Sequence, residues 1–211
     1  MSSLEVGQQS KPRYEFRSFG QEFDAAHHRM ARLSVPVPEA VWERHSDEIY
    51  ILSHVNDVNN TKIRDGKMDI KTLVDIQQGL EQWDPLMKAE FPIQRSLLIE
   101  QVIPAFQVEV ALTDQEVFSL TEFLEMIRMH PKLQSARVHK KRFGYMVNDT
   151  ICEYGYVLIN GARVATINSE STEVDDIQKT LDDIGLDGVE NINYLQAIKR
   201  VIGMIDKPLA N

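Results

Sequence analysis

The residues around Asp65-Gly66 constrain the fold more than any other stretch of this sequence. An Asp-Gly pair favours a two-residue β-hairpin turn, because glycine tolerates the positive φ angle that a type I′ turn requires. Such a turn pairs Ile63 with Met68 and Lys62 with Asp69. Side chains alternate between the two faces of a strand, so one face of this hairpin is apolar. The other face carries Lys62, Arg64, Lys67, Asp69 and Lys71. The charged face is either a solvated surface over a core or an anion-binding surface, and both interpretations stay open on the hairpin alone.

Three further segments towards the other end of the chain show the same two-faced pattern. Residues 137–145, 151–159 and 163–170 are predicted to form consecutive strands, with turns at Asn148-Asp149 and Asn160-Gly161. The polar residues that these strands carry on one face are Lys140 and Arg142, then Glu153, then Thr166, Asn168 and Glu170. The recurrence of this pattern indicates a sheet that is apolar on one side and charged on the other.

Hydrophobic spacing predicts the remaining elements. Strands are expected at residues 14–19, 48–53 and 105–112, where apolar and polar side chains alternate. Helices are expected at residues 38–44, 113–129, 174–184 and from about 192, with a start resembling a capping box at residues 172–175. Residues 72–83 have helical spacing, but Gly79 weakens that interpretation and Pro85 ends the segment.

Composition narrows the class of protein. The chain has 211 residues, of which 43% are hydrophobic and 26% charged, and this is typical of a globular protein. Its formal net charge of −9 argues against bulk electrostatic binding to nucleic acid or to an anionic membrane. The single Cys152 excludes an intrachain disulfide and favours a reducing compartment. The start of the sequence lacks the apolar segment of a secretory signal, and no apolar run is long enough to span a membrane. We therefore expect a cytoplasmic protein.

The order of the charged motifs resembles that of the CYTH superfamily, the triphosphate tunnel metalloenzymes that include class IV adenylyl cyclases and thiamine triphosphatases. The motifs that carry the resemblance are Arg13-Tyr14-Glu15-Phe16-Arg17, Lys62-Ile63-Arg64, Asp69-Ile70-Lys71, Lys140-Lys141-Arg142, Asn168-Ser169-Glu170 and Asn191-Ile192-Asn193-Tyr194. Three positions depart from the family pattern. Arg13 and Asn168 stand where glutamates are expected, and Arg17 stands where a lysine is expected.

The resemblance implies an α+β fold, with an antiparallel β-barrel of about eight strands and helices packed outside it. It implies a single tunnel domain over residues 13–205, after a disordered lead at residues 1–12 and before a tail at residues 206–211. The expected triphosphate-binding residues are Arg17, Lys62, Arg64, Lys71, Lys140 and Arg142. The expected catalytic residues are Glu15, Glu153 and Glu170, and the expected ligands of Mg²⁺ or Mn²⁺ are Glu15, Glu170, Asp69 and Glu109.

Lysine and arginine suit a triphosphate because several cationic donors offset its charge. Hard divalent cations prefer oxygen ligands, and such cations stabilise the charge that develops in phosphoryl transfer.

The resemblance leaves several functions open. A metal-dependent hydrolase of inorganic, nucleoside or thiamine triphosphate is the first, and a nucleotidyl cyclase is a variant of the same chemistry. A binder of nucleotide or polyphosphate without catalysis is the alternative, favoured by the incomplete set of carboxylates. The expected partner is a small triphosphate or nucleotide, with no nucleic acid and no membrane. A homodimer is among the assembly states that the sequence leaves open.

Overall fold

Eight antiparallel strands close into a barrel in the computed structural model, which describes residues 12–211. The barrel strands are β1 (Tyr14–Gly20), β2 (Glu43–Ser53), β3 (Asn59–Arg64), β4 (Lys67–Gln77), β5 (Leu80–Glu90), β8 (Leu133–Val147), β9 (Thr150–Ile159) and β10 (Ala162–Ser171). Around the barrel they follow the order β1-β10-β9-β8-β2-β3-β4-β5, and β5 pairs with β1 to close the ring. The barrel confirms the α+β fold class. The disordered lead predicted for residues 1–12 lies, except for Pro12, outside the described residues.

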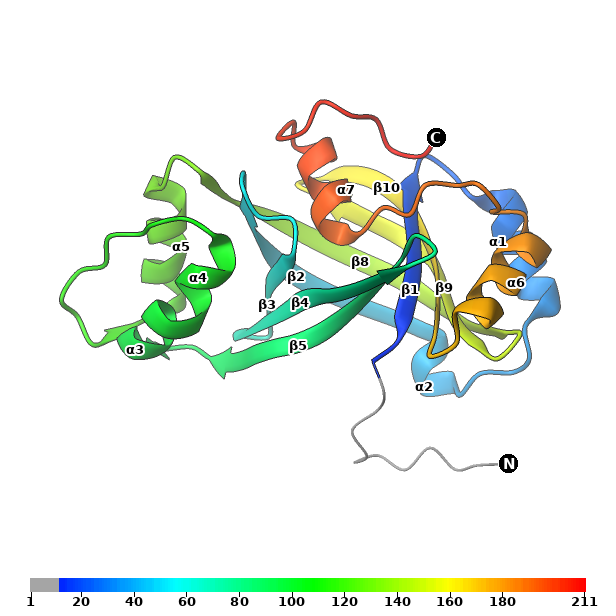
Figure 1. The fold of residues 1–211 in the computed structure, drawn as a ribbon, viewed down its shortest axis with the longest axis horizontal. Coiled ribbons are helices and arrows are strands. Elements are labelled where there is room, and N and C mark those ends of the chain that lie inside the picture. Colours follow the sequence, from blue (N-terminus) through cyan, green and yellow to red (C-terminus); the bar gives the residue numbers. More distant parts are fainter. Residues whose placement is uncertain (1–11) are drawn as a thin grey trace.

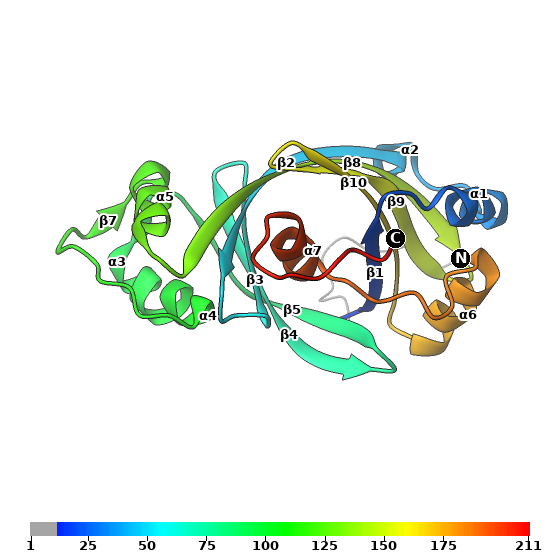
Figure 2. The ribbon, with the colours of Figure 1, turned by 90° about the horizontal axis from the view of Figure 1, so that it is seen from above.

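The helices occupy three places relative to the barrel. A helical lobe lies at one end, with α3 (Arg95–Leu97), the π-helical turn η1 (Leu98–Val102), α4 (Ile103–Phe106), α5 (Leu120–Met129) and the short strands β6 (Ile93–Gln94) and β7 (Val117–Phe118) (Figure 1). At the other end lie α1 (Asp24–Leu33), α2 (Glu39–Trp42) and α6 (Val174–Ile184). The last helix, α7 (Tyr194–Val201), lies inside the ring of strands (Figure 2).

The hairpin at Asp65-Gly66 forms as predicted. Ile63 pairs with Met68 and Lys62 with Asp69, and both turn residues have positive φ angles. Ile63 and Met68 are buried against the helical lobe, so the apolar face of the hairpin points outward to the lobe and not to solvent. The charged face is thereby left on the side of the lumen.

The three strands predicted near the C-terminal end are β8, β9 and β10, and their turns at Asn148-Asp149 and Asn160-Gly161 have left-handed φ angles. Their outer face is covered by α1 and α6. Cys152, Ala165 and Ile167 are buried there, in a core shared with Ile177 and Leu181 of α6. The apolar side of this part of the sheet is therefore the outside of the barrel, and the polar side is the inside.

Helix α7 fills one end of the lumen. Leu195 and Ile198 pack against the lumen-facing side chains Phe19 of β1, Leu52 of β2 and Val157 of β9. Asn193 caps the helix by accepting a hydrogen bond from the backbone N–H of Gln196. This apolar packing closes one end of the barrel, and the polar part of the lumen lies beyond it.

Several predicted elements are wrong. Residues 72–83 form no helix but the facing parts of β4 and β5, which turn at Gln78-Gly79, where both residues have positive φ angles. Residues 105–112 form no strand, because Ala105 and Phe106 end α4 and Gln107 has a left-handed φ angle. Helix α5 begins at Leu120 and not near Thr113, with a capping box between Ser119 and Glu122.

The start of α6 also differs from the prediction. Its N-cap residue is Glu173, and no side chain caps the helix. None of the helices in residues 12–211 is long and apolar enough to cross a membrane.

Candidate functional site

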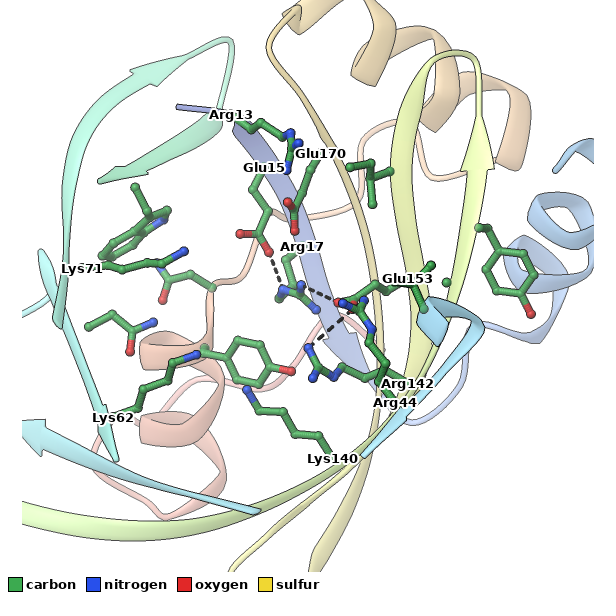
Figure 3. A pocket seen from close by; sticks show the side chains of 18 of the residues that line it. Arg13, Glu15, Arg17, Arg44, Lys62, Lys71, Lys140, Arg142, Glu153 and Glu170 are labelled. Atoms are coloured by element: carbon green, nitrogen blue, oxygen red, sulfur yellow. Dashed lines mark hydrogen bonds and ion pairs between the residues drawn. The ribbon is translucent and has the colours of Figure 1, made fainter. Parts of the chain in front are cut away.

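The barrel encloses a cavity of about 500 Å³ that is rich in basic side chains. Seven basic residues line it, namely Arg13, Arg17, Arg44, Lys62, Lys71, Lys140 and Arg142. Three carboxylates line it, namely Glu15, Glu153 and Glu170. Figure 3 shows that Lys62 and Lys71 face the glutamates and arginines from the opposite wall of the barrel. The cavity is thus strongly cationic, although the whole chain carries a formal net charge of −9.

Strand register explains why these side chains meet. Glu15 of β1 lies opposite Glu170 of β10, and Arg17 lies opposite Asn168, whose other cross-strand neighbour is Glu153 of β9. Residues two apart on a strand share a face, so Glu15 and Arg17 both point into the lumen. The first and last barrel strands are neighbours, and residues more than 150 positions apart therefore form one site.

Glu153 is the centre of a buried ion-pair network. Its carboxylate lies 3.2 Å from Arg17 Nη2 and 3.4 Å from Arg142 Nη1, and it also pairs with Arg44 (Figure 3). Arg17 Nε donates to Glu15 Oε1 at 2.5 Å. Burial alone would raise the pKa of Glu153, but the charges of Arg17, Arg142 and Arg44 outweigh it and lower that pKa. Glu153 therefore stays ionised and holds the guanidinium groups together.

A second network lies around Lys140, which is 2% exposed. Its ammonium group is 2.7 Å from Glu48 Oε2 and donates to the Tyr50 hydroxyl at 2.7 Å. Burial would raise the pKa of Glu48, but Lys140 and Lys62 lower it to about 2. Burial also holds the pKa of Lys140 well below its ordinary value.

Glu170 is in a different environment from Glu153 and Glu48, whose pKa values are lowered. Burial, together with the charge of Glu15, raises the pKa of Glu170 to about 7. Its Oε1 accepts a hydrogen bond from Asn168 Nδ2 at 2.9 Å. Arg13 lies beside the pair in Figure 3, and its charge acts in the opposite direction on the pKa of Glu170. Arg17 offsets the charge of Glu15 in part, and a further positive charge beside Glu170 would offset the remaining repulsion between the two carboxylates.

Several buried polar atoms that line the cavity have no hydrogen-bond partner among the described residues. They are the Nε atoms of Arg44 and Arg142, Asn60 Oδ1 and the hydroxyl of Tyr194. Buried polar groups in proteins normally have partners. The unpaired Nε–H groups and the tyrosine hydroxyl are donors, as an anion requires.

Tyr194 reaches the cavity from α7. Its ring stacks on Tyr50 with 5.5 Å between ring centroids, and Lys140 Nζ lies 3.7 Å from its ring centroid. Burial raises the pKa of Tyr194, so its hydroxyl keeps its proton and remains a donor. The helix that fills one end of the barrel thereby also forms part of the cavity wall.

The oxygen atoms present suit a divalent cation only in part. Within residues 12–211, no group of three or more His, Cys, Asp or Glu side chains is placed to hold a metal ion. Glu15 and Glu170 are nevertheless cross-strand neighbours, and Asn168 next to them has an unpaired Oδ1. Mg²⁺ is usually bound by one or two carboxylates together with substrate phosphates and water. The residues therefore fit a cation that shares its coordination with a bound phosphate, and they do not fit a cation held by protein ligands alone.

The structure brings together most of the side chains singled out from the sequence. Those that line the cavity are Glu15, Arg17, Lys62, Lys71, Lys140, Arg142, Glu153 and Glu170. Arg64 does not line it, because it lies at the hairpin turn with its side chain 48% exposed, 3.6 Å from Glu48. Asp69 is opposite Lys62 but does not line the cavity either.

The expectation for Glu109 was wrong. It rested on a strand at residues 105–112, whereas Glu109 lies exposed in the segment between α4 and β7, outside the barrel. Its backbone oxygen accepts a hydrogen bond from His130. Glu109 is therefore no candidate for the cavity.

Sequence reasoning missed Arg44 and Tyr50, which line the cavity, and Glu48, which pairs with the cavity residue Lys140. All three lie on one face of β2, which begins at Glu43, five residues before the strand predicted there. The alternation Arg44, Ser46, Glu48, Tyr50 was the signal that could have found them. Tyr194 belongs to the Asn191–Tyr194 motif of the resemblance, but it was assigned no role in the site.

Comparison with known proteins gives no evidence about the chemistry of this chain. No family model matches the sequence, and no curated protein matches it. A proposed adenylate cyclase from Bacillus halodurans has a similar structure, with a TM-score of 0.48 and 11% identity over 87% of this chain and 96% of that chain. A conserved hypothetical protein from Pyrococcus furiosus has a TM-score of 0.44 and 16% identity, over 87% of this chain and 98% of that one.

A third similar structure is that of a proposed adenylyl cyclase from Hippeastrum, which is described as having a dominant triphosphatase activity. Its TM-score is 0.41 and its identity 10%, over 82% of this chain and 88% of that chain. At TM-scores below 0.5 these similarities carry no argument about function.

Proposed function

We propose that this protein binds a triphosphate group in the barrel cavity and hydrolyses it with the help of Mg²⁺ or Mn²⁺. The observation that carries the proposal is the excess of basic side chains in the cavity, seven against three carboxylates, in a chain of negative net charge. Like charges gathered in one cavity repel one another unless an anion compensates them. The resemblance of the charged motifs to those of the CYTH superfamily supports the same substrate class.

The arrangement of donors supports a chain of phosphates and not a single one. Arg44 and Arg142 offer unpaired Nε–H groups on the wall formed by β2 and β8. Lys62 and Lys71 face them from β3 and β4. Guanidinium groups bind phosphate oxygens in forked pairs and ammonium groups bind them as point charges. Donors on opposite walls suit an extended anion that lies between them.

Glu15 and Glu170 are the residues that would hold the divalent cation, with Asn168 Oδ1 beside them. When bound, the cation stabilises the negative charge that builds up as a phosphoric anhydride bond breaks. The chain's own residues position the phosphates and neutralise the remaining charge. Phosphoryl transfer depends mainly on these two contributions.

The test is release of phosphate from tripolyphosphate and from a panel of nucleoside triphosphates, with and without Mg²⁺ or Mn²⁺. We expect release that requires the metal, and we expect Glu15→Gln together with Glu170→Gln to lower the rate at least about 100-fold while tripolyphosphate still binds. Glu116→Gln, at an exposed position outside the barrel, is the matched control. Activity that survives in the double variant would reject the metal assignment.

A second candidate is a triphosphate-binding protein without catalysis, and one observation favours it. The carboxylate of Glu15 is already paired with Arg17, and Glu153 is paired with three arginines. In this case tripolyphosphate binds tightly, and the release assay shows no free phosphate under any metal condition. Absence of both binding and release would overturn both candidates.

A further inference from the structure

The helical lobe carries an apolar groove at the end of the molecule opposite to α1 and α6 (Figure 1). The groove has a volume of about 680 Å³ and lies between α5 and the segment that leads to β7. Its apolar side chains include Val110, Leu112, Met126 and Met129, and Met129 is 68% exposed. Methionine side chains are flexible and are common at surfaces that bind varied partners. None of the residues that line this groove also lines the barrel cavity.

Residues 108–113 have the side-chain pattern of a strand but form no strand. Val108, Val110 and Leu112 pack against the core of the lobe, whereas the residues between them are exposed. Such alternation is characteristic of a strand with one buried face. Within residues 12–211, however, no backbone hydrogen bond joins this segment to another part of the backbone. The segment therefore resembles an edge strand without a partner.

Two side-chain contacts hold this segment in place. His130, the residue after α5, donates from Nε2 to the carbonyl oxygen of Glu109 at 3.0 Å, and Arg95 Nε donates to that of Thr113 at 3.1 Å. Between these two points, the backbone N–H and C=O groups of residues 110–112 have no hydrogen-bond partner among the residues that the structure describes. Water can satisfy these groups in the free protein. The backbone of an added strand can satisfy them equally well.

The surface around the groove is acidic. Residues 107–127 contain five carboxylates and no lysine or arginine. All five carboxylates are exposed, namely Glu109, Asp114, Glu116, Glu122 and Glu125. Arg128 pairs with Glu125, and the other four form no ion pair within the described part of the chain. The groove therefore favours a partner with positive charge and disfavours an acidic one.

We propose that this groove binds an extended peptide segment of another protein, which carries alternating apolar and basic side chains and pairs with residues 110–112 as an added strand. The apolar side chains of the peptide enter the groove beside Met126 and Met129, and its basic side chains face the exposed carboxylates. In such complexes the backbone hydrogen bonds supply affinity, and the contacts of alternate side chains supply specificity. The groove is separate from the barrel cavity, so the inference does not depend on the proposed function.

Synthetic peptides of matched sequence test the proposal by calorimetry. The parent probe is a six-residue peptide of alternating valine and lysine with blocked ends. One derivative is N-methylated at the three valine amides and the other at the three lysine amides. In an added strand the N–H groups of alternate residues point to opposite sides, so only one of the two sets faces residues 110–112. We expect one derivative to bind at least about tenfold more weakly than the parent, the other to bind as the parent does, and a valine–glutamate peptide not to bind.

A variant of the protein locates the site. Met129→Lys should weaken binding of the parent peptide at least about tenfold, because it replaces an apolar contact in the groove by a charge that repels the basic peptide. Ile76→Lys is the matched control, because it adds the same charge on β4 at a position that is 58% exposed and outside the lobe. We expect it to bind the peptide as the native protein does. Circular dichroism verifies that both variants are folded.

Four other outcomes would overturn the proposal. If the parent peptide does not bind, the groove is no peptide site. If both N-methylated derivatives bind as the parent does, no strand is added, and if the valine–glutamate peptide binds equally well, the partner is not basic. If folded Met129→Lys binds the peptide unchanged, the peptide lies elsewhere. A native dimer that Met129→Lys dissociates in sedimentation would show that a second copy of this chain occupies the groove instead.

Discussion

Glu48 keeps its negative charge at a place where burial opposes it. The carboxylate is 3% exposed, and Lys140, Lys62 and Arg64 all lie within 4 Å of it. Because Lys140 and Lys62 lower its pKa to about 2, from an ordinary value of 4.5, the ion pairs stabilise the folded state above about pH 4.5. That contribution is lost as the pH falls from about 4.5 towards 2.

Replacing Glu48 should therefore have a pH-dependent effect on stability. We expect Glu48→Gln to lower the free energy of unfolding at pH 7 by about 3 kcal/mol, because Lys140 is left buried without its counter-charge. The difference from the native protein should shrink as the pH falls below about 4.5. Urea unfolding at pH 7, 5 and 3 measures it.

Glu90→Gln is the matched control for this measurement. Glu90 also forms an ion pair, with Lys67, but both side chains are exposed, and we expect no measurable change. A constant difference between Glu48→Gln and the native protein at all three pH values would contradict the assigned ion pairs.

At the scale of elements, the position of α7 depends on one buried lysine. Lys199 is 2% exposed, and its ammonium group donates to the carbonyl oxygen of Asn56 at 2.7 Å and to Asp57 Oδ1 at 2.8 Å. These contacts join α7 to the loop between β2 and β3. Tyr194 lies at the start of the same helix and lines the cavity. The contacts of Lys199 therefore help to fix a part of the cavity wall.

Removing this charge should loosen the helix and weaken the site together. We expect Lys199→Met to lower the free energy of unfolding by about 1–3 kcal/mol, because the carbonyl of Asn56 is left unsatisfied. We also expect a severalfold weaker affinity for tripolyphosphate, since the Tyr194 hydroxyl is no longer held in place. Calorimetry and urea unfolding measure the two effects.

Lys179→Met removes an exposed i,i+4 ion pair with Asp183 on α6 and serves as the matched control, with neither effect expected. A folded Lys199→Met variant that binds tripolyphosphate as the native protein does would show that α7 and the site are independent.

The sequence predicted best the elements that local chemistry determines. The Asp65-Gly66 hairpin and the three strands near the C-terminal end carry both a turn signal and an alternating pattern, and all of them form. Residues 72–83 misled because Leu73 and Ile76 on β4, with Leu80 on β5, are spaced like a helical stripe across a tight turn. The alternation at residues 105–112 was also misleading, because its apolar side chains pack within the helical lobe.

The site could be predicted only where a residue lay on a predicted strand. Lys140, Arg142 and Glu153 were found because each is on the polar face of such a strand. Arg44 was missed because β2 begins earlier than its hydrophobic residues indicate. Tyr194 belonged to a motif of the resemblance but was assigned no site role, because its place in the lumen depends on how α7 packs inside the barrel, which no local pattern encodes.

At the scale of the whole molecule, the distribution of charge matters more than its sum. The formal net charge is −9, yet the cavity holds seven basic side chains and three carboxylates. The local positive field of the cavity attracts an anion even though the net charge of the chain is negative.

A polyanion that binds the folded cavity should stabilise the whole protein. We expect tripolyphosphate at 100 times its dissociation constant to add about 2.7 kcal/mol to the free energy of unfolding and to raise the Tm accordingly. Orthophosphate at the same concentration is the control and should raise the Tm much less, because it reaches fewer of the basic side chains. Mg²⁺ alone should have little effect.

Identical melting curves with and without millimolar tripolyphosphate would count heavily against the basic cavity as a ligand site. Melting followed by circular dichroism is sufficient for the comparison.

The pairing of β1 with β10 also sets the time at which the protein becomes functional during its synthesis. Glu15 and Arg17 leave the ribosome early, whereas their neighbours Glu170 and Asn168 are made about 150 residues later. At about 5–20 residues per second, that interval lasts roughly 8–30 seconds. During it the first strand has no β10 to pair with, and its buried face remains available to wrong partners. The nascent chain therefore exposes this edge of β1 until its last barrel strand has emerged.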